Sequence, residues 1–344
     1  MKAAGPLFSL VLALALPSLC VAIPARAEPI TPERVLSAAR PAPDGSRLIA
    51  ATESGGGLLD LRVHSAAMNA DIDLKVVRAP DDSKPAPVLY LLNGAGGGSD
   101  ASSWPDQTDI VDFFHDKQVT LVNPLGGNGS YFTDWQRDDP LLGRVRWSTF
   151  LTRELPPIID SALNGNGANA IAGISMAGTS VFQLALDAPG LYRAIGSYSG
   201  CARTSDPLGR LFVDAVVLRW QGDPANMWGT PDDPAWPAND PYLHADRLRG
   251  TAIYVSSGTG IPGPQDTLDG AGVHGNAAKL LSQLVSGGFL EAITDLCARA
   301  LRDRLHALDI PATFQLRPNG THSWGYWQQD LHDSWPLFEH ALRG

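Results

Sequence analysis

Ser175 is the residue whose surroundings first suggest chemistry. It lies in the segment Gly173-Ile174-Ser175-Met176-Ala177-Gly178, after an apolar stretch at residues 168–172 and before TSVFQLALD at residues 179–187. The first stretch is typical of a buried strand and the second of a packed helix. A serine in a sharp turn from strand to helix is a nucleophile elbow, which needs small neighbours because the serine backbone is strained. The Gly-x-Ser-x-x-Gly pattern alone is equally compatible with an ordinary turn.

A serine hydroxyl becomes a nucleophile when a base, usually histidine, takes its proton and a carboxylate orients that base. Of the eight histidines, His322 lies in a polar loop after the last predicted strand, and the others are expected at surface or core positions. The order serine, carboxylate, histidine is that of α/β hydrolases. Glu291 is favoured as the carboxylate because it follows residues 287–290 at the start of an amphipathic helix, which is more rigid than a loop. Most of the other acidic residues between serine and histidine are interpreted as solvated loop charges: Asp206, Asp214, Asp223, Asp240, Asp266, Asp269 and Asp295.

Acyl transfer also needs two backbone N–H groups directed at the oxygen that gains charge. One is expected from Met176, directly after the serine, where the N-terminus of a helix favours negative charge. The second is expected from Ala95 in the loop Asn93-Gly94-Ala95-Gly96-Gly97-Gly98. A glycine-rich turn without a ligand is the alternative interpretation of this loop.

Strands that alternate with helices position these residues. Buried strands are predicted over residues 88–92, 119–123, 168–172, 194–199, 251–256 and 312–316, with a helix over 149–162. This alternation predicts an α/β fold with a mainly parallel central sheet and helices on both faces. A hairpin is expected over residues 58–78, after a lead-in with little regular structure over residues 28–57.

Residues 205–245 interrupt this alternation with several prolines and with Trp220, Trp228 and Trp236. We interpret them as an insertion over the sheet edge rather than a second domain, so that residues 58–344 form a single domain. A length of 344 residues is by itself compatible with one large domain or two small ones.

Composition excludes several classes of function. A hydrophobic content of 44% and a charged content of 18% indicate a globular protein with a large core. The formal net charge of −10 argues against nucleic acid as a partner, because phosphate binding depends on clustered Lys and Arg. No group of His, Cys and acidic residues has the spacing of metal ligands, so neither a metal nor another cofactor is expected.

The N-terminus predicts export. Lys2 precedes an apolar run over residues 7–21, and Ala25-Arg26-Ala27 supplies a cleavage site with small residues, so residues 1–27 are predicted to be a signal peptide cleaved after Ala27. The apolar run is short for a membrane anchor, and no later segment is long and apolar enough to span a membrane. We therefore expect an exported protein located outside the cell or in the cell envelope.

Export also changes the number of cysteines. Cys20 leaves with the predicted leader, so Cys201 and Cys297 remain as a pair in an oxidising compartment. A disulfide between them is predicted, and two buried unpaired thiols are the alternative.

The chain resembles a known family, the secreted mycolyltransferases, which include the antigen 85 complex of mycobacteria and its corynebacterial relatives. The resemblance extends over residues 58–342 and its motifs occur in family order: LYLLNG (89–94), YFTDW (131–135), TFLTRE (149–154), GISMAG (173–178), MWG (227–229), DPAW (233–236), FLE (289–291) and NGTHSW (319–324).

This resemblance implies an α/β-hydrolase fold with Ser175 as nucleophile, His322 as general base and then acid, and Glu291 as the orienting carboxylate. It implies transfer of mycolyl groups between trehalose esters, and onto cell-wall arabinogalactan, through an acyl-serine intermediate. Trp324 and the apolar insertion are expected to line the acyl site, and a core role is the alternative for these aromatic residues.

The chain also departs from the family pattern. Many members carry Asp-Gly-Leu-Arg where this chain has Asn93-Gly94-Ala95-Gly96, and in those members the Asp and Arg contact the sugar. The resemblance makes Asn93 and Gly96 candidate substrate-binding positions from which the charged contacts are lost. The pair Cys201 and Cys297 is typical of only part of the family. Two further functions stay open: a secreted carboxylesterase or lipase of the same fold, and a surface binding protein with little turnover.

Overall fold

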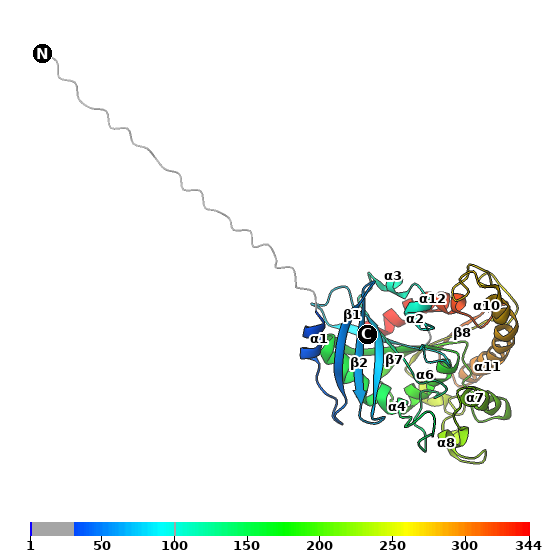
Figure 1. Cartoon of the computed structure of the whole chain (residues 1–344). Coiled ribbons are helices and arrows are strands. Elements are labelled where there is room, and N and C mark those ends of the chain that lie inside the picture. The colour runs from blue at the N-terminus through cyan, green and yellow to red at the C-terminus, as the bar shows by residue number, and fades with distance from the viewer. Residues whose placement is uncertain (2–30, 100) are drawn as a thin grey trace.

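The computed structural model describes residue 1, residues 31–99 and residues 101–344, so the predicted signal peptide lies almost wholly outside the described residues. In this part of the chain one sheet has nine strands in the order β1-β2-β3-β5-β4-β6-β7-β8-β9 (Figure 1). The strands are β1 (Arg47–Ser54), β2 (Leu58–Ser65), β3 (Ala70–Val77), β4 (Ala86–Leu92), β5 (Thr120–Pro124), β6 (Gly165–Ile174), β7 (Tyr192–Tyr198), β8 (Ala252–Ser257) and β9 (Thr313–Leu316).

The sheet is mainly parallel, as the sequence predicts. The pairs β1–β2, β2–β3 and β3–β5 are antiparallel, whereas every pair in the series β5-β4-β6-β7-β8-β9 is parallel. Parallel strands covered on both faces are apolar throughout, and β4 is the clearest case, because Leu89 to Leu92 are fully buried.

Helices cover both faces of this sheet. Helices α1 (Pro32–Ala38), α5 (Leu155–Ala162), α6 (Met176–Asp187) and α11 (Gly288–Ala307) pack on one face, in the same hydrophobic cluster as Tyr90 and Leu92. Helices α2 (Trp104–Gln107), α3 (Ile110–Phe114) and α12 (Trp324–Arg343) pack on the other face with Leu89 and Leu91. Alternate residues of one strand therefore serve two cores, and the predicted α/β-hydrolase fold class is confirmed.

The remaining helices lie in connections. They are α4 (Trp147–Thr149), the π-helix η1 (Phe150–Glu154), α7 (Pro207–Arg219), α8 (Pro224–Trp228), α9 (Ala235–Ala238), the 3-10 helix η2 (Ala245–Leu248), α10 (Ala277–Ser282) and the π-helix η3 (Gln283–Gly287). None of the helices in the described part of the chain is long and apolar enough to cross a membrane.

The expectation of little regular structure in residues 28–57 was wrong where the structure describes them. Helix α1 begins after Thr31, whose side chain caps Arg34 N–H, and Pro32 occupies its first turn. Strand β1 pairs with β2 at the edge of the sheet and buries only Ala51, so its sequence lacks a clear alternation of apolar and polar residues. The cap and proline at residues 31–32 were the available signal for the helix.

The segment 205–245 contains three of these short helices and shares the main core. Trp228 and Trp236 are buried in the hydrophobic cluster that also holds α5 and α6. Asp139 anchors the segment, since its carboxylate accepts hydrogen bonds from Asp223 N–H and the Asn226 side chain. The core role that the sequence left open for these tryptophans is therefore the one that Trp228 and Trp236 have.

Candidate active site

Ser175 occupies the sharp turn between β6 and α6. Its backbone has φ 57° and ψ −122°, a left-handed conformation that a non-glycine residue adopts at a strained, functional turn. A Cβ on Gly173 would lie 2.7 Å from Ala177 O, and one on Gly178 would lie 2.9 Å from Gly200 Cα. Only glycine allows this approach of strand, helix and the neighbouring loop, which explains the glycines around the serine.

The structure brings the three predicted triad residues together. The Ser175 hydroxyl lies 2.8 Å from Nε2 of His322, and Nδ1 of His322 lies 2.9 Å from Oε2 of Glu291. Ser175 directly follows β6, His322 follows β9, and Glu291 lies in the first turn of α11, so the site is assembled at the carboxyl edge of the sheet. This chain of hydrogen bonds can move a proton from the serine hydroxyl to the imidazole while the carboxylate stabilises the resulting charge.

Glu291 is fully buried, and the carboxylate oxygen that does not face His322 accepts three hydrogen bonds. Oε1 accepts hydrogen bonds from Ser199 Oγ at 2.9 Å, Ser257 Oγ at 3.0 Å and Gly258 N–H at 2.6 Å. Three donors on one oxygen fix the carboxylate and leave the other oxygen for His322. Sequence reasoning missed Ser199 and Ser257, although both stand at the carboxyl ends of predicted parallel strands, where such partners gather.

His322 is held from two further directions. Its backbone N–H donates to Gly287 O at 3.2 Å, so η3 supports the histidine loop. The Trp327 ring packs edge-on against the imidazole at 5.0 Å, and its indole N–H donates to Ser199 Oγ at 2.9 Å. The same tryptophan therefore contacts the base directly and the carboxylate through Ser199.

A buried ion pair lies behind the triad. Arg317 pairs with Asp330, whose side chain is fully buried, and burial raises the pKa of Asp330 to about 6 although the guanidinium opposes the shift. The pKa of Arg317 is raised by the nearby negative charges of Asp330 and Glu291, which outweigh its burial. The guanidinium thus offsets the negative charge that is buried in this part of the core.

The glycine-rich loop after β4 faces the serine. A Cβ on Gly94 would lie 3.4 Å from Ser175 Cβ, and Ala95 lines the same cavity as the serine. The backbone N–H groups of Ala95 and Met176 donate no hydrogen bond to any other described residue. Neither amide is therefore occupied by a protein acceptor, and their role as oxyanion donors stays a prediction.

Asn93 is a correction to the candidate substrate-binding set. Its side chain is fully buried, does not line the cavity, and donates to Gly97 O and Pro124 O. Gly96 also lies outside the cavity lining, and its α-carbon faces the Trp220 ring, which a Cβ would approach to 3.4 Å. Asn93 thus shapes the loop rather than contacting substrate, because the chain turns its side chain toward the core.

A cavity of about 930 Å³ opens beside the triad. Ser175, His322 and Trp324 line it, together with a row of side chains from α7 and another from α10 to α11. Its walls are mostly apolar, with Leu211 and Phe212 on one side and Phe289 and Ile293 on the other. The further apolar residues of these walls are Leu208, Ala215, Val216 and Leu290. Trp324 is thus in the cavity wall, and α7 is the part of the insertion that lines the site.

The predicted disulfide is confirmed. Cys201, in the loop after β7, is bonded to Cys297 of α11 across 96 positions of sequence. The bond ties the strand end that carries Ser199 to the helix that carries Glu291. Among residues 31–99 and 101–344, no three His, Cys, Asp or Glu side chains gather in a way that could hold a metal ion.

Comparison with known proteins points in one direction. The family model named Esterase matches residues 65–338. Diacylglycerol acyltransferase/mycolyltransferase Ag85A of Mycobacterium leprae is 32% identical over 292 residues, which are 82% of this chain and 82% of that protein. Diacylglycerol acyltransferase/mycolyltransferase Ag85B of Mycobacterium avium is 32% identical over 293 residues, with the same coverage of 82% of both chains.

Solved structures agree on the fold. The crystal structure of MPT51 (FbpC1) from Mycobacterium tuberculosis superposes with a TM-score of 0.67 at 25% identity, covering 83% of this chain and 98% of that one. An S-formylglutathione hydrolase from Agrobacterium tumefaciens superposes with a TM-score of 0.58 at 14% identity, covering 86% of this chain and 99% of that one. The second likeness is one of fold alone.

Proposed function

Because the chain belongs to the Esterase family and, within it, to the mycolyltransferases, we propose that Ser175 takes an acyl group from a lipid ester and passes it to a hydroxyl acceptor. The observation that carries this proposal is the hydrogen-bonded series from Ser175 through His322 to Glu291, at 2.8 and 2.9 Å. The chain is a serine-dependent enzyme of the acyltransferase type.

In the first half of the reaction, Nε2 of His322 accepts the proton of the Ser175 hydroxyl as the serine oxygen bonds to the ester carbonyl carbon. The carbonyl oxygen becomes negative and is stabilised by the N–H groups of Met176 and Ala95. His322 then gives its proton to the departing alcohol, which leaves an acyl-serine. Glu291 keeps Nδ1 of the imidazole protonated and stabilises the cation.

In the second half, the acceptor hydroxyl gives its proton to His322 and bonds to the acyl carbon. The serine oxygen leaves and recovers the proton from the imidazole, so no charge or atom is left over. Water in place of the acceptor would release a free acid. Transfer therefore depends on the acceptor competing with water for the same acyl-serine.

We assign mycolyl groups as the acyl chains, trehalose mycolates as donors, and a trehalose ester or cell-wall arabinogalactan as acceptor. The similarity to diacylglycerol acyltransferase/mycolyltransferases supports a long acyl donor, and so does the apolar cavity of about 930 Å³ beside Ser175. The predicted signal peptide at residues 1–27 supports a location outside the cell or in the cell envelope, where such acceptors are found.

A secreted esterase is the second candidate, and the loop after β4 favours it. Gly96 has no side chain, and Asn93 points into the core, so this loop offers an acceptor sugar no charged side chain at either position. A weakly held acceptor would leave the acyl-serine to water.

The test is a paired assay with trehalose monomycolate in which the transfer product and the free acid are both measured. Trehalose dimycolate or acylated arabinan as the main product is expected, and mainly free acid would identify an esterase. An absence of turnover with Ser175 unlabelled by a serine-directed phosphonate would contradict both and favour a surface binding protein.

A further inference from the structure

Helix α7 has two apolar faces, only one of which is covered by protein. Gly209, Val213 and Val217 are buried against the core at a spacing of one helical turn. The opposite face lines the cavity and continues past it, with Leu211 62% exposed and Leu218 60% exposed. A surface helix ordinarily presents polar residues on the face turned away from the core. This apolar face of α7 is therefore not covered by another described part of the protein.

A second apolar stripe follows the helical segment from α10 through η3 into α11. Its members are Leu281, Val285, Phe289 and Leu296, and each is at least 59% exposed. Successive members are separated by about one or two helical turns, so they follow one side of the segment. Phe289 lines the cavity, whereas Leu281, Val285 and Leu296 lie outside it. An acyl chain inside the cavity would thus leave most of this stripe uncovered.

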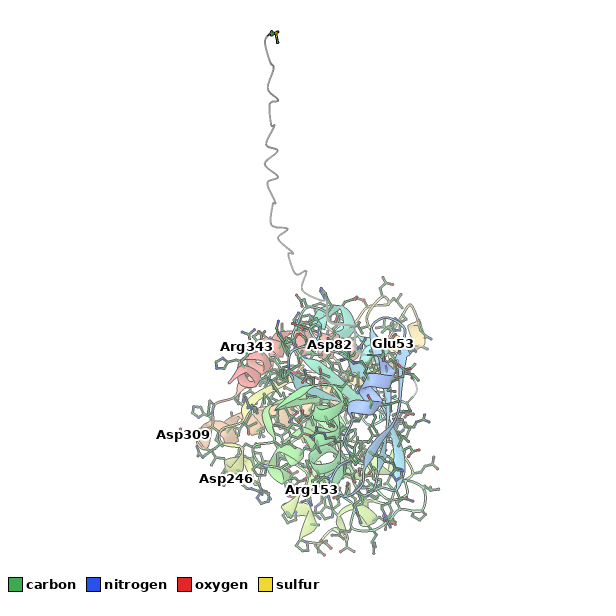
Figure 2. The ribbon with its side chains drawn as sticks, turned by 90° about the vertical axis from the view of Figure 1, so that its left-hand side faces the viewer. Glu53, Asp82, Arg153, Asp246, Asp309 and Arg343 are labelled. Atoms are coloured by element: carbon green, nitrogen blue, oxygen red, sulfur yellow. A yellow bond between two sulfur atoms is a disulfide. The ribbon has the colours of Figure 1, made fainter. Side chains whose placement is uncertain are left out.

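The two stripes stand on either side of the cavity mouth, since both helical segments line the cavity. In Figure 1 α7, α10 and α11 lie together at one end of the molecule, far from α1 and β1. We call this surface the apolar rim: Leu211, Leu218, Leu281, Val285, Phe289 and Leu296. The end opposite the rim faces the viewer in Figure 2, where the charged residues Glu53, Asp82 and Arg153 are labelled. Exposed apolar side chains on both helical segments beside one cavity mark an interaction surface.

Two cations accompany the rim. Arg219 at the end of α7 and Lys279 in α10 both line the cavity mouth, and neither side chain bonds to or pairs with another described residue. The acidic residues on the same helices are otherwise engaged. Asp295 pairs with Arg299, and Asp303 pairs with Arg302. Asp214 is half-buried, and Glu291 is fully buried in the triad. Unpaired cations beside apolar side chains complement an anionic apolar interface.

We propose that the apolar rim binds an anionic lipid surface, with the cavity mouth facing the lipid. Lipid fits better than a second copy of this chain, because a symmetric dimer through the rim would bring the unpaired cations of both copies together. Bound in this way, the enzyme would receive an ester with a long acyl chain directly from the lipid layer. The binding itself does not depend on the function proposed for Ser175.

The experiment measures co-flotation of the chain from residue 28 onward, so that the apolar run of the predicted leader is absent. Vesicles of phosphatidylcholine with phosphatidylglycerol are compared with vesicles of phosphatidylcholine alone. The parent should float with the anionic vesicles, and Leu281→Gln/Val285→Gln/Leu296→Gln should weaken partitioning about tenfold or more without adding charge. Lys279→Gln should weaken it about fivefold, and added salt should reduce the difference between the two vesicle types.

Matched controls separate the rim from exposed apolar residues in general. Leu36→Gln/Ile49→Gln, at the opposite end of the molecule, should float like the parent. Ser175→Ala should also float like the parent, whether or not it loses activity. The triple rim variant should keep the parent's rate on a short soluble ester, because its three residues lie outside the cavity. Binding to neither vesicle type, or equal binding by the triple variant, would overturn the proposal. So would a dimer in light scattering that the triple variant abolishes.

Discussion

The surroundings of Glu291 and the face of α7 that lines the cavity differ in almost every physical respect. Glu291 is fully buried, and each of its oxygens accepts a hydrogen bond of 3.0 Å or less. The α7 face presents leucine, phenylalanine and valine side chains to an open cavity, with Leu211 mostly exposed. The hydrogen bonds around Glu291 hold its charge in one position, whereas the α7 face offers apolar contacts that do not depend on orientation.

This difference reflects what each region has to do. Proton transfer requires atoms held to within a few tenths of an ångström, and buried hydrogen bonds supply that restraint. An acyl chain has no polar atoms to be positioned, so apolar area alone stabilises it and its fit can vary. Substitutions around Ser175 and Glu291 should therefore change kcat, and substitutions in the cavity wall should change the preference for chain length.

The largest effect is expected for Ser175→Ala. Without the hydroxyl no acyl-serine forms, so kcat for ester turnover should fall by about 10⁴-fold or more, while the thermal midpoint stays near that of the parent. Steady-state kinetics and thermal denaturation measure the two quantities. A variant that kept full activity would refute the mechanism.

Glu291→Gln should lower kcat by about 10²–10⁴-fold, because an amide no longer stabilises the imidazolium and can select the wrong tautomer of His322. The control is Asp295→Asn, one turn later on α11, where the carboxylate pairs with a partly exposed arginine. Its kcat should stay within about threefold of the parent, because this carboxylate pairs with Arg299 and not with His322. Equal losses in both variants would show that α11, rather than the Glu291 charge, is what matters.

Removal of the disulfide tests how much the crosslink beside Glu291 contributes to stability. Cys201→Ser/Cys297→Ser should lower the free energy of unfolding by about 2–4 kcal/mol, because the crosslink restricts the unfolded chain over a long loop. Denaturant titration of the parent, the variant and the reduced parent measures this. An unchanged midpoint would mean that the crosslink has no part in stability.

Substitution of Asp139 tests how residues 205–245, which contain α7, are anchored. Burial alone would raise its pKa, but hydrogen bonds from Leu141, Leu142, Asp223 and Asn226 outweigh burial and lower the pKa to about 2. Asp139→Ala should cost about 2 kcal/mol of unfolding free energy near neutral pH. Asp138→Ala, which removes an exposed pair with Arg144, should cost less than about 0.5 kcal/mol.

The same residue predicts a pH dependence. A lowered folded-state pKa contributes stability above the ordinary value of 3.8, and that contribution is lost as pH falls from 3.8 toward 2. Urea midpoints of parent and Asp139→Ala should therefore converge on acidification. Midpoints that stay equally far apart at low pH would show that the Asp139 charge is not the cause.

The smallest effect is expected in the cavity wall. Leu211→Gln should lower kcat/KM about three- to tenfold for a long-chain ester and leave a short-chain ester unchanged, because only the long chain reaches this wall. Leu141→Gln is the control, since this leucine is 68% exposed and lies outside the cavity lining. A loss that is equal for both esters would place Leu211 with the catalytic residues instead.

Local sequence determined a large part of this molecule. The nucleophile turn at Ser175, the parallel strands and the helix that begins near Glu291 all rest on patterns within a few residues. His322 was identified by its place after the last strand and by the resemblance to a known family. Weak local patterns failed: β1 is an exposed edge strand, and no strong alternation marks it.

Only the tertiary structure decided which way side chains point and what they meet. Asn93 stands in the expected loop, yet its amide turns inward because Gly97 O and Pro124 O accept from it. Ser199 and Ser257 end different strands and meet at Glu291 because parallel strands terminate at one edge. The exposed face of α7 follows from the same cause: contacts between distant segments are set by the packing of whole elements, which no short stretch of sequence encodes.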